Sequence, residues 1–183
     1  MPRITPVQPA DANGKAKQLL DAVQAKFGLT PNLMKTLATS PAALEGYLNF
    51  GAALAGGAFD TKFREQIALT VSQANSCEYC LAAHTALGHV VGLEPDDITA
   101  SRHARASDPK GEAGLVFAQA IVVNRGDVSD DAVKRVRAAG FTDGEITELV
   151  AHVAINIFSN YYNNVAQTVL DFPSVELSLA TAG

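Results

Sequence analysis

Hydrophobic residues recur along this chain at intervals of three and four, with polar and charged residues between them. This spacing places the apolar side chains on one face of an α-helix, as in a helix packed against a core. No run of alternating β-branched and polar residues bounded by turn signals is present, so the pattern disfavours a β-sheet. We expect an all-α protein.

Local start and stop signals divide the chain into nine predicted helices. Ser40, Asp60 and Ser129 each place a capping side chain before an apolar run. Residues 142–145 have the sequence of a capping box. The expected helices cover residues 11–27, a short stretch from 31, 41–56, 61–74, 77–92, a short stretch from 94, 109–124, 130–140 and 143–170. Because the connections are short, we expect residues 1–183 to form a single helical domain.

The composition is that of a globular chain, since 48% of the 183 residues are hydrophobic and the net charge is −5. An acidic chain with scattered Lys and Arg lacks the basic face that binds phosphates, so we expect no nucleic-acid partner. No stretch reaches the roughly 20 apolar residues of a membrane span, and residues 1–6 lack the apolar core of a signal peptide. We therefore expect a cytoplasmic protein, in which a disulfide serves transient chemistry.

The two cysteines of the chain lie close together, and titratable residues accompany them. Cys77 and Cys80 form a CxxC motif, and His84 follows one helical turn later. At about 100° per residue, these three residues share one helix face. Glu65 lies twelve positions before Cys77. Two thiols, an imidazole and a carboxylate predict a dithiol redox centre with its proton-handling groups.

The start of this helix is expected to favour a thiolate. We expect Asn75 or Ser76 to cap the helix and Cys77 to lie in its first turn, where free N–H groups and the helix dipole stabilise negative charge. His84 is placed to accept a thiol proton and return it to a leaving group. Glu65 shares its helix face with apolar residues, so we expect it to point inward, where burial raises the pKa of a carboxyl group.

Other interpretations of these residues stay open. The two cysteines, His84 and Glu65 could in principle supply four zinc ligands, but structural zinc sites take their ligands as two separated pairs. Only one cysteine pair exists here. A glutamate beside an arginine, as Glu65 is beside Arg64, is also typical of a solvated surface charge. A histidine considered alone is typical of a core residue. We favour redox chemistry and expect no metal ion.

The motif resembles that of a known family. Glu65, eleven intervening residues, the Cys77-x-x-Cys80 pair, three residues and His84 resemble the core motif of the AhpD-like alkylhydroperoxidases, within the carboxymuconolactone decarboxylase superfamily. The resemblance centres on a redox core at about residues 60–92. The rest of the chain looks like the uncharacterised peroxidase-related branch of that family. The type member also has a histidine directly before the second cysteine, where this chain has Tyr79.

The resemblance implies an all-α AhpD-like domain that assembles as a homo-oligomer, a trimer or a hexamer, and reduces hydroperoxides with no cofactor. One cysteine would attack the peroxide and the other would close a disulfide, with Glu65 and His84 as the proton relay. We expect Cys80 to attack, because His84 is its nearest base, and Cys77 to resolve, although the helix N-terminus favours the reverse. A thioredoxin-like protein or a lipoyl-bearing partner would then restore the thiols.

Two alternative functions remain at this point. The first is a redox-sensing or zinc-binding CxxC module without turnover. The second is a decarboxylase-like enzyme in which the cysteines are incidental. Substituting both cysteines distinguishes them from a peroxidase, which would lose its peroxide-dependent thiol oxidation.

A second polar set occupies the last predicted helix at helical spacing. Its members are His152, Asn156, Asn160 and Asn163 or Asn164. Buried amides and imidazoles need hydrogen-bond partners, so we expect this set, together with Tyr79, to line a cavity or an interface. The alternative is that the stripe faces solvent.

The sequence also contains a faint repeat. Residues 59–60 and 66–71 resemble residues 141–142 and 148–153 at a constant offset. The repeat predicts an internal duplication of a helix pair. Two amphipathic helices with similar apolar spacing explain it equally well.

Overall fold

The computed structural model describes residues 2–177, and within that range its regular structure consists of nine α-helices. The all-α prediction is therefore confirmed. The helices are α1 (Gly14–Phe27), α2 (Asn32–Leu37), α3 (Pro41–Ala55), α4 (Thr61–Ala74), α5 (Glu78–Val90), α6 (Pro95–Arg102), α7 (Pro109–Val123), α8 (Asp130–Ala138) and α9 (Asp143–Ala166). None of these helices combines the length and hydropathy needed to cross a membrane.

Four predicted N-caps make the expected hydrogen bonds. The side chains of Ser40, Asp60 and Ser129 each accept from the backbone N–H three residues later. Thr142 and Glu145 form a capping box at the start of α9. Each such bond satisfies an N–H group that has no partner within the helix, and a cap contributes about 0.5–2 kcal/mol. The starts of α3, α4, α8 and α9 therefore lie where the sequence predicts them.

Two predicted boundaries are wrong, because the backbone rather than a capping side chain sets them. α1 begins at Gly14 instead of after Asp11. The N–H groups of Asp11 and Ala12 both donate to the carbonyl of Gln8, which makes a separate turn. α9 ends at Ala166 instead of near residue 170, since Gln167 adopts a left-handed conformation with φ of 50° that the helix cannot continue through.

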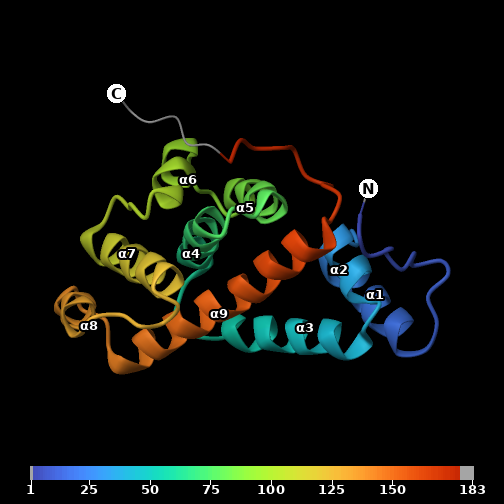
Figure 1. Ribbon diagram of the computed structural model, residues 1–183, viewed down its shortest axis with the longest axis horizontal. Helices are drawn as coiled ribbons and strands as arrows, with labels where there is room; N and C mark the ends of the chain where they lie inside the picture. Colours follow the sequence, from blue (N-terminus) through green and yellow to red (C-terminus); the bar gives the residue numbers. More distant parts are fainter. Residues whose placement is uncertain (1, 178–183) are drawn as a thin grey trace.

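The central helix of the fold is α4. It packs against α5, α6, α7 and α9, and its residues 67–72 are buried without interruption. α9 runs diagonally across the molecule, with α8 near its start and α2 near its end, and α3 lies beside it (Figure 1). The CxxC segment lies in the short connection from α4 to α5 and at the start of α5, so the dithiol lies within the folded core.

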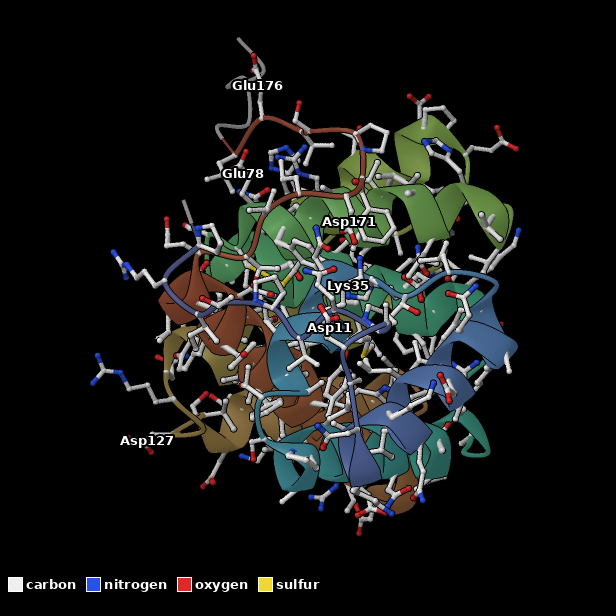
Figure 2. All side chains as sticks on the ribbon, turned by 90° about the vertical axis from the view of Figure 1, so that its right-hand side faces the viewer. Asp11, Lys35, Glu78, Asp127, Asp171 and Glu176 are labelled. Atoms are coloured by element: carbon white, nitrogen blue, oxygen red, sulfur yellow. A yellow bond between two sulfur atoms is a disulfide. The ribbon has the colours of Figure 1, made fainter. Side chains whose placement is uncertain are left out.

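The N-terminal helices and the C-terminal segment together cover one end of this core. Apolar residues of α1 and α2 join a hydrophobic cluster that also contains both cysteines. After α9 the chain passes α2, where the Asp171 carboxylate accepts from the Asn32 backbone N–H at 2.6 Å. Figure 2 views the molecule from this end, with α1, α2 and Asp171 turned to the viewer. α1, α2 and the segment after α9 thus pack on the hydrophobic cluster that contains both cysteines, and we call them the cover.

The repeat in the sequence corresponds to two helices that share a core. Phe59 and Phe141 each precede an N-cap, of α4 and α9 respectively, and their ring centroids lie 6.1 Å apart. Both rings belong to the same hydrophobic cluster. The two helices also pack against each other. An ancestral duplication stays a prediction.

Candidate functional site

The two cysteines lie within disulfide distance at the start of α5. A disulfide joins Cys77 and Cys80, whose Cα atoms are 5.3 Å apart, within the usual range for this bond. The expected cap at Asn75 or Ser76 is wrong, because Cys77 itself is the N-cap. Its backbone is extended, and its Sγ atom accepts from the Cys80 backbone N–H at 3.3 Å. Cys77 therefore receives an amide that a helix N-terminus would otherwise leave unpaired.

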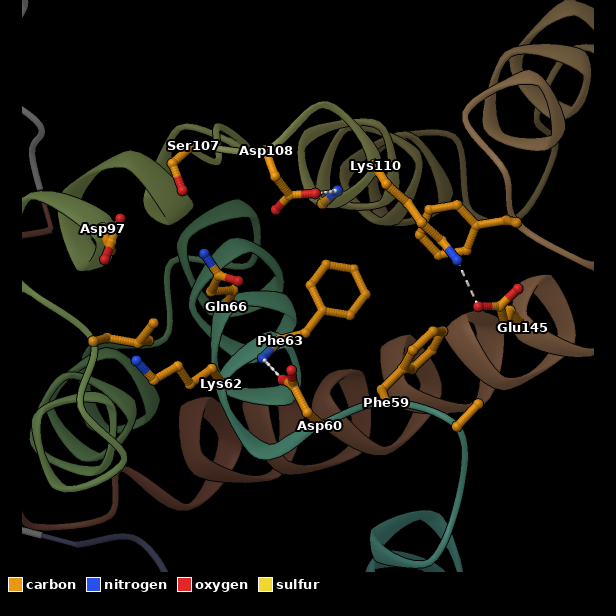
Figure 3. Close-up of a pocket in the computed structure, with 14 residues that line it drawn as sticks. Phe59, Asp60, Lys62, Phe63, Gln66, Asp97, Ser107, Asp108, Lys110 and Glu145 are labelled. Atoms are coloured by element: carbon orange, nitrogen blue, oxygen red, sulfur yellow. Dashed lines mark hydrogen bonds and ion pairs between the residues drawn. The ribbon is translucent and has the colours of Figure 1, made fainter.

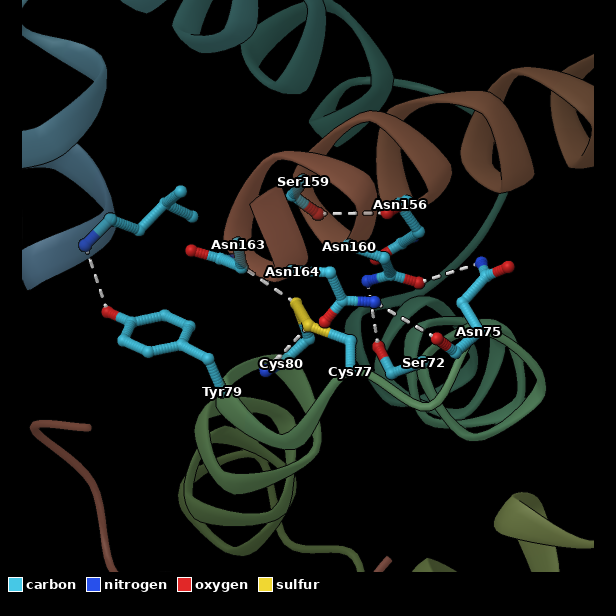
Figure 4. The surroundings of a disulfide bond; sticks show 11 residues. Ser72, Asn75, Cys77, Tyr79, Cys80, Asn156, Ser159, Asn160, Asn163 and Asn164 are labelled. Atoms are coloured by element: carbon cyan, nitrogen blue, oxygen red, sulfur yellow. Dashed lines mark hydrogen bonds between the residues drawn. A yellow bond between two sulfur atoms is a disulfide. The ribbon is translucent and has the colours of Figure 1, made fainter. Parts of the chain in front are cut away.

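Both sulfur-bearing residues are buried. Cys77 is 0% exposed and Cys80 is 3% exposed. In Figure 4 the disulfide lies between α5 and α9, and the Asn163 side chain of α9 approaches it. The Asn163 Nδ2 atom donates to the Cys80 Sγ atom at 3.2 Å. Each sulfur thus has its own N–H donor, one from the backbone of α5 and one from a distant helix.

The structure brings Glu65 and His84 together, as the proposed relay requires. The Glu65 Oε2 atom lies 2.7 Å from the His84 Nδ1 atom, and both side chains are largely buried. An ionised carboxylate can only accept a hydrogen bond, so this contact assigns the proton to Nδ1. The Nε2 atom of His84 is then the position that can accept a further proton.

The Glu65–His84 pair lines a cavity of about 210 Å³ between α3, α4, α5 and α9. From α9, His152 and Asn156 contribute to the same lining, and Tyr47 contributes from α3. Two members of the predicted polar stripe therefore face the cavity that contains the relay pair. Sequence reasoning did not identify Tyr47, because nothing in its local pattern distinguishes it from a core tyrosine.

The interpretation of the polar stripe as solvent-facing is wrong. His152, Asn156, Asn160 and Asn163 are each at most 7% exposed. Of the two alternatives at the end of the stripe, Asn163 contacts sulfur, whereas the Asn164 amide donates to the Asn75 carbonyl at 3.2 Å. The stripe therefore packs inside the chain, against α4 and α5.

Asn160 binds the turn that precedes Cys77. Its Oδ1 atom accepts from Asn75 Nδ2 at 3.0 Å, and its Nδ2 atom donates to Ser72 Oγ at 3.2 Å. The Ser72 carbonyl in turn accepts from the Cys77 backbone N–H at 3.0 Å. These bonds connect α9 to the segment that presents the cysteines, and Figure 4 shows the two that Asn160 makes. Sequence reasoning did not identify Ser72 and Asn75 as its partners.

Tyr79 contacts the cover instead of the cavity. Its hydroxyl accepts from the Leu33 backbone N–H in α2 at 3.2 Å, and its ring packs edge-on against Phe172 with centroids 5.9 Å apart. Burial raises the pKa of the Tyr79 phenol far above its ordinary value, so the hydroxyl stays protonated at neutral pH. Tyr79 thus links the cysteine helix to both covering segments.

His152 is a neutral imidazole at neutral pH. Burial lowers its pKa, and the Arg64 cation acts in the same direction, while Glu148 opposes them. The His152 Nε2 atom lies 3.6 Å from Glu148 Oε1, which is too long for a hydrogen bond. The Glu148 carboxylate instead accepts from the Ala58 backbone N–H at 2.9 Å. His152 therefore offers the cavity an uncharged ring.

A larger cavity of about 420 Å³ lies between α4, α6 and α7 (Figure 3). Its carboxylates serve the helix ends, since Asp60 and Asp108 are N-caps and Glu145 belongs to the α9 capping box. The Lys110 ammonium, and then the Thr142 backbone, lower the pKa of Glu145 to about 2. Neither cysteine, nor Glu65 or His84, lines this cavity. These three carboxylates stabilise helix ends, and the cavity is separate from the dithiol site.

The four residues weighed as zinc ligands do not form a single group. Within residues 2–177, no three or more His, Cys, Asp or Glu side chains come together in an arrangement that could hold a metal ion. The cysteines pair with each other, and Glu65 pairs with His84.

Comparison with known proteins relates this arrangement to a family. Residues 41–121, from α3 to α7, match the model of the carboxymuconolactone decarboxylase family. The structure is similar to an uncharacterized peroxidase-related protein with an alkylhydroperoxidase AhpD core from Ralstonia eutropha JMP134. The two chains have 26% identity and a TM-score of 0.83, over 93% of this chain and 92% of the other. Residues 41–121 are thus similar to the carboxymuconolactone decarboxylase family, and the chain as a whole has an AhpD-like fold.

Other solved structures share the AhpD-like fold. An uncharacterized peroxidase-related protein from Silicibacter sp. TM1040 has 22% identity and a TM-score of 0.78, over 89% of this chain and 88% of the other. The debrominase Bmp8, solved in complex with 2,3,4-tribromopyrrole, has 18% identity and a TM-score of 0.78, over 92% of this chain and 91% of the other. No curated protein shows a significant sequence match. The fold thus occurs in proteins with different described activities.

Residues 41–121, which match the family model, contain only part of the candidate site. Glu65, both cysteines and His84 lie within residues 41–121. The α9 residues that contact the cavity and the sulfurs lie outside that span. The surroundings of the dithiol are therefore completed by a helix that the family model does not cover.

Proposed function

We propose that this protein is a dithiol hydroperoxide reductase. The observation that carries the proposal is the CxxC pair within disulfide distance at the start of α5, followed one turn later by His84, which pairs with Glu65 of α4. The pair of thiols supplies two electrons, and the imidazole supplies and accepts protons. The family match and the AhpD-like fold support the same chemistry at a coarser level.

The reaction begins when the Cys80 thiolate attacks the outer oxygen of the hydroperoxide O–O bond. The O–O bond breaks, Cys80 becomes a sulfenic acid, and the alkoxide leaves as an alcohol after taking a proton. We assign this step to Cys80 because His84 follows it by one turn on the same helix. Cys77 then attacks the sulfenic sulfur, water leaves, and the disulfide forms.

The Glu65–His84 pair would handle the protons of both steps. Glu65 holds the ring through Nδ1 at 2.7 Å, which leaves Nε2 to accept the proton that a thiol releases. The protonated ring then donates to the departing alkoxide. The proposed transfer uses only side chains of this chain.

An external dithiol would complete the cycle by thiol–disulfide exchange. A thioredoxin-like protein or a lipoyl-bearing partner would transfer two electrons and two protons and leave as its own disulfide. Exchange requires direct contact between sulfur atoms, and both cysteines are buried. We therefore propose that the α1–α2 cover opens to admit the reductant.

We also propose that the protein assembles with copies of itself through α3 and α9. An apolar groove of about 350 Å³ lies between these helices, and Phe50 and Phe158 on it are 40% and 42% exposed. Contiguous exposed apolar surface of this kind marks interaction sites. Phe158→Glu should reduce the molar mass measured by light scattering, whereas Val90→Glu, at an 82% exposed position on α5, should not. An unchanged mass in Phe158→Glu would argue against this interface.

The test of the proposed function is a count of free thiols in reduced, metal-free protein before and after one equivalent of cumene hydroperoxide. Rapid loss of both thiols, with a mass decrease of about two hydrogens per chain, is the expected result. His84→Ala should slow this loss by roughly 10²-fold or more, and Glu65→Gln should slow it as well. His89→Ala, an exposed histidine on the same helix, is the matched control.

Two outcomes would contradict the proposal. Thiols that survive the hydroperoxide but react with 2,3,4-tribromopyrrole would indicate a different electrophile, in line with the debrominase of the same fold. Thiols that survive both, yet exchange with protein disulfides, would indicate a redox sensor without turnover. Cys77→Ser and Cys80→Ser, analysed by mass after peroxide, identify the attacking cysteine, because only the chain that retains it forms a sulfenic acid.

A further inference from the structure

We propose that the Asn163 side-chain amide is a catalytic residue that stabilises the Cys80 thiolate. The inference deepens the proposed function, since it rests on the same dithiol. Asn163 lies on α9, outside the span that matches the family model, and its Nδ2 atom donates to Cys80 Sγ at 3.2 Å across 83 positions of sequence. The donor therefore touches the reacting atom directly.

The surroundings of Asn163 argue that this contact does not serve stability. The residue is 3% exposed, and its Oδ1 atom has no hydrogen-bond partner among the described residues. In Figure 4 this oxygen points away from the sulfurs. An amide with one buried atom unpaired is costly compared with an apolar side chain of similar size. The single bond from its side chain goes to sulfur.

The chemistry of that bond favours one protonation state of Cys80. An N–H group donates more strongly to a charged acceptor than to a neutral one, and more so in a buried site. The thiolate is therefore stabilised relative to the thiol, which lowers the pKa of Cys80. Cys77 receives its donor from the backbone instead, so Asn163 acts selectively on the cysteine assigned to peroxide attack.

The titration of Cys80 takes place among several other ionisable groups. The elements packed around it carry Tyr47 on α3, Glu65 on α4, Cys77 at the N-cap of α5, Tyr79 and His84 on α5, Tyr162 on α9, and Asp171 in the C-terminal segment. None of these is altered by a substitution at position 163. A difference in the Cys80 titration midpoint between variants at position 163 therefore measures the effect of the Asn163 amide.

The experiment measures thiolate formation without peroxide. In a Cys77→Ser background, in which serine can still cap α5, Cys80 is the sole thiol, and its thiolate is followed by ultraviolet absorbance against pH. The double cysteine variant is subtracted to remove tyrosine ionisation. Asn163→Leu should shift the midpoint upward by about one to two pH units, the usual strength of a hydrogen bond to a charged group. Asn163→Ala should do the same, and it replaces the leucine variant if that chain does not fold.

A matched control uses a buried polar residue on the same helix. Ser159 is 3% exposed and donates to the Asn156 carbonyl at 3.0 Å, so Ser159→Ala should leave the midpoint unchanged. An unchanged midpoint in folded Asn163→Leu or Asn163→Ala would overturn the inference, as would an equal shift in Ser159→Ala. If Asn163→Leu shifts the midpoint but the thiols do not react with hydroperoxide, the role of the Asn163 amide is supported and only the proposed function is refuted.

Discussion

Removing the Tyr79 hydroxyl should loosen the cover over the dithiol. In Tyr79→Phe the Leu33 backbone N–H in α2 loses its acceptor at 3.2 Å. Leu33 lies in the first turn of α2 and is buried, so its N–H has no partner within the helix. Leaving a buried donor unsatisfied costs about 1–3 kcal/mol. If α2 detaches locally, the population of the open state should rise by about 5- to 150-fold.

Two measurements on the reduced protein check this prediction. Amide hydrogen exchange of α2 should accelerate, and alkylation of the two cysteines by iodoacetamide should accelerate by a similar factor, because both require the same opening. Tyr161→Phe is the matched control, since Tyr161 is 56% exposed on α9. Unchanged exchange in α2, or faster alkylation without faster exchange, would refute the idea that α2 covers the sulfurs as one hinged unit.

Three further predictions concern stability. Gly114→Ala should lower the free energy of unfolding by about 1–3 kcal/mol in urea titrations, because its Cβ would lie 2.7 Å from the rings of Phe63 and Phe141; Gly46→Ala, which has open space, should instead be neutral or stabilising. Asn160→Ala should cost about 1–3 kcal/mol, measured in the same way, because Ser72 and Asn75 each lose a hydrogen-bond partner. Glu145 has a pKa of about 2 against an ordinary 4.5. The stabilisation that its ionised form gives to the folded state is therefore complete above pH 4.5 and is lost as the pH falls toward 2. In Glu145→Gln the free energy of unfolding should lack this pH-dependent part, which is small because solvent screens the pair.

The elements of this fold are largely predictable because their signals are local. A capping side chain acts on an N–H three residues away, so Asp60 and Thr142 identify their helices without any tertiary information. Where the backbone itself makes the turn, as at Gln8 and Gln167, no side chain signals the boundary. The cap of α5 was predicted wrongly for the same reason. The backbone of Ser76 adopts a left-handed conformation with φ of 50°, and the next residue, Cys77, is the N-cap.

The sequence alone identified the chemical groups of the candidate site but not their surroundings. The CxxC spacing places two sulfurs one turn apart on any helix, and the Glu65–His84 pair follows from two adjacent helices that must pack together. Only the tertiary structure decided that Asn163 reaches Cys80 and that residues of α1 and α2 share one hydrophobic cluster with both cysteines. These contacts join segments more than 30 residues apart in sequence, and they depend on how α9 and the N-terminal helices dock. The physical reason is that helical periodicity specifies which face of a helix is apolar, whereas the packing of side chains between helices specifies which residue on that face meets sulfur.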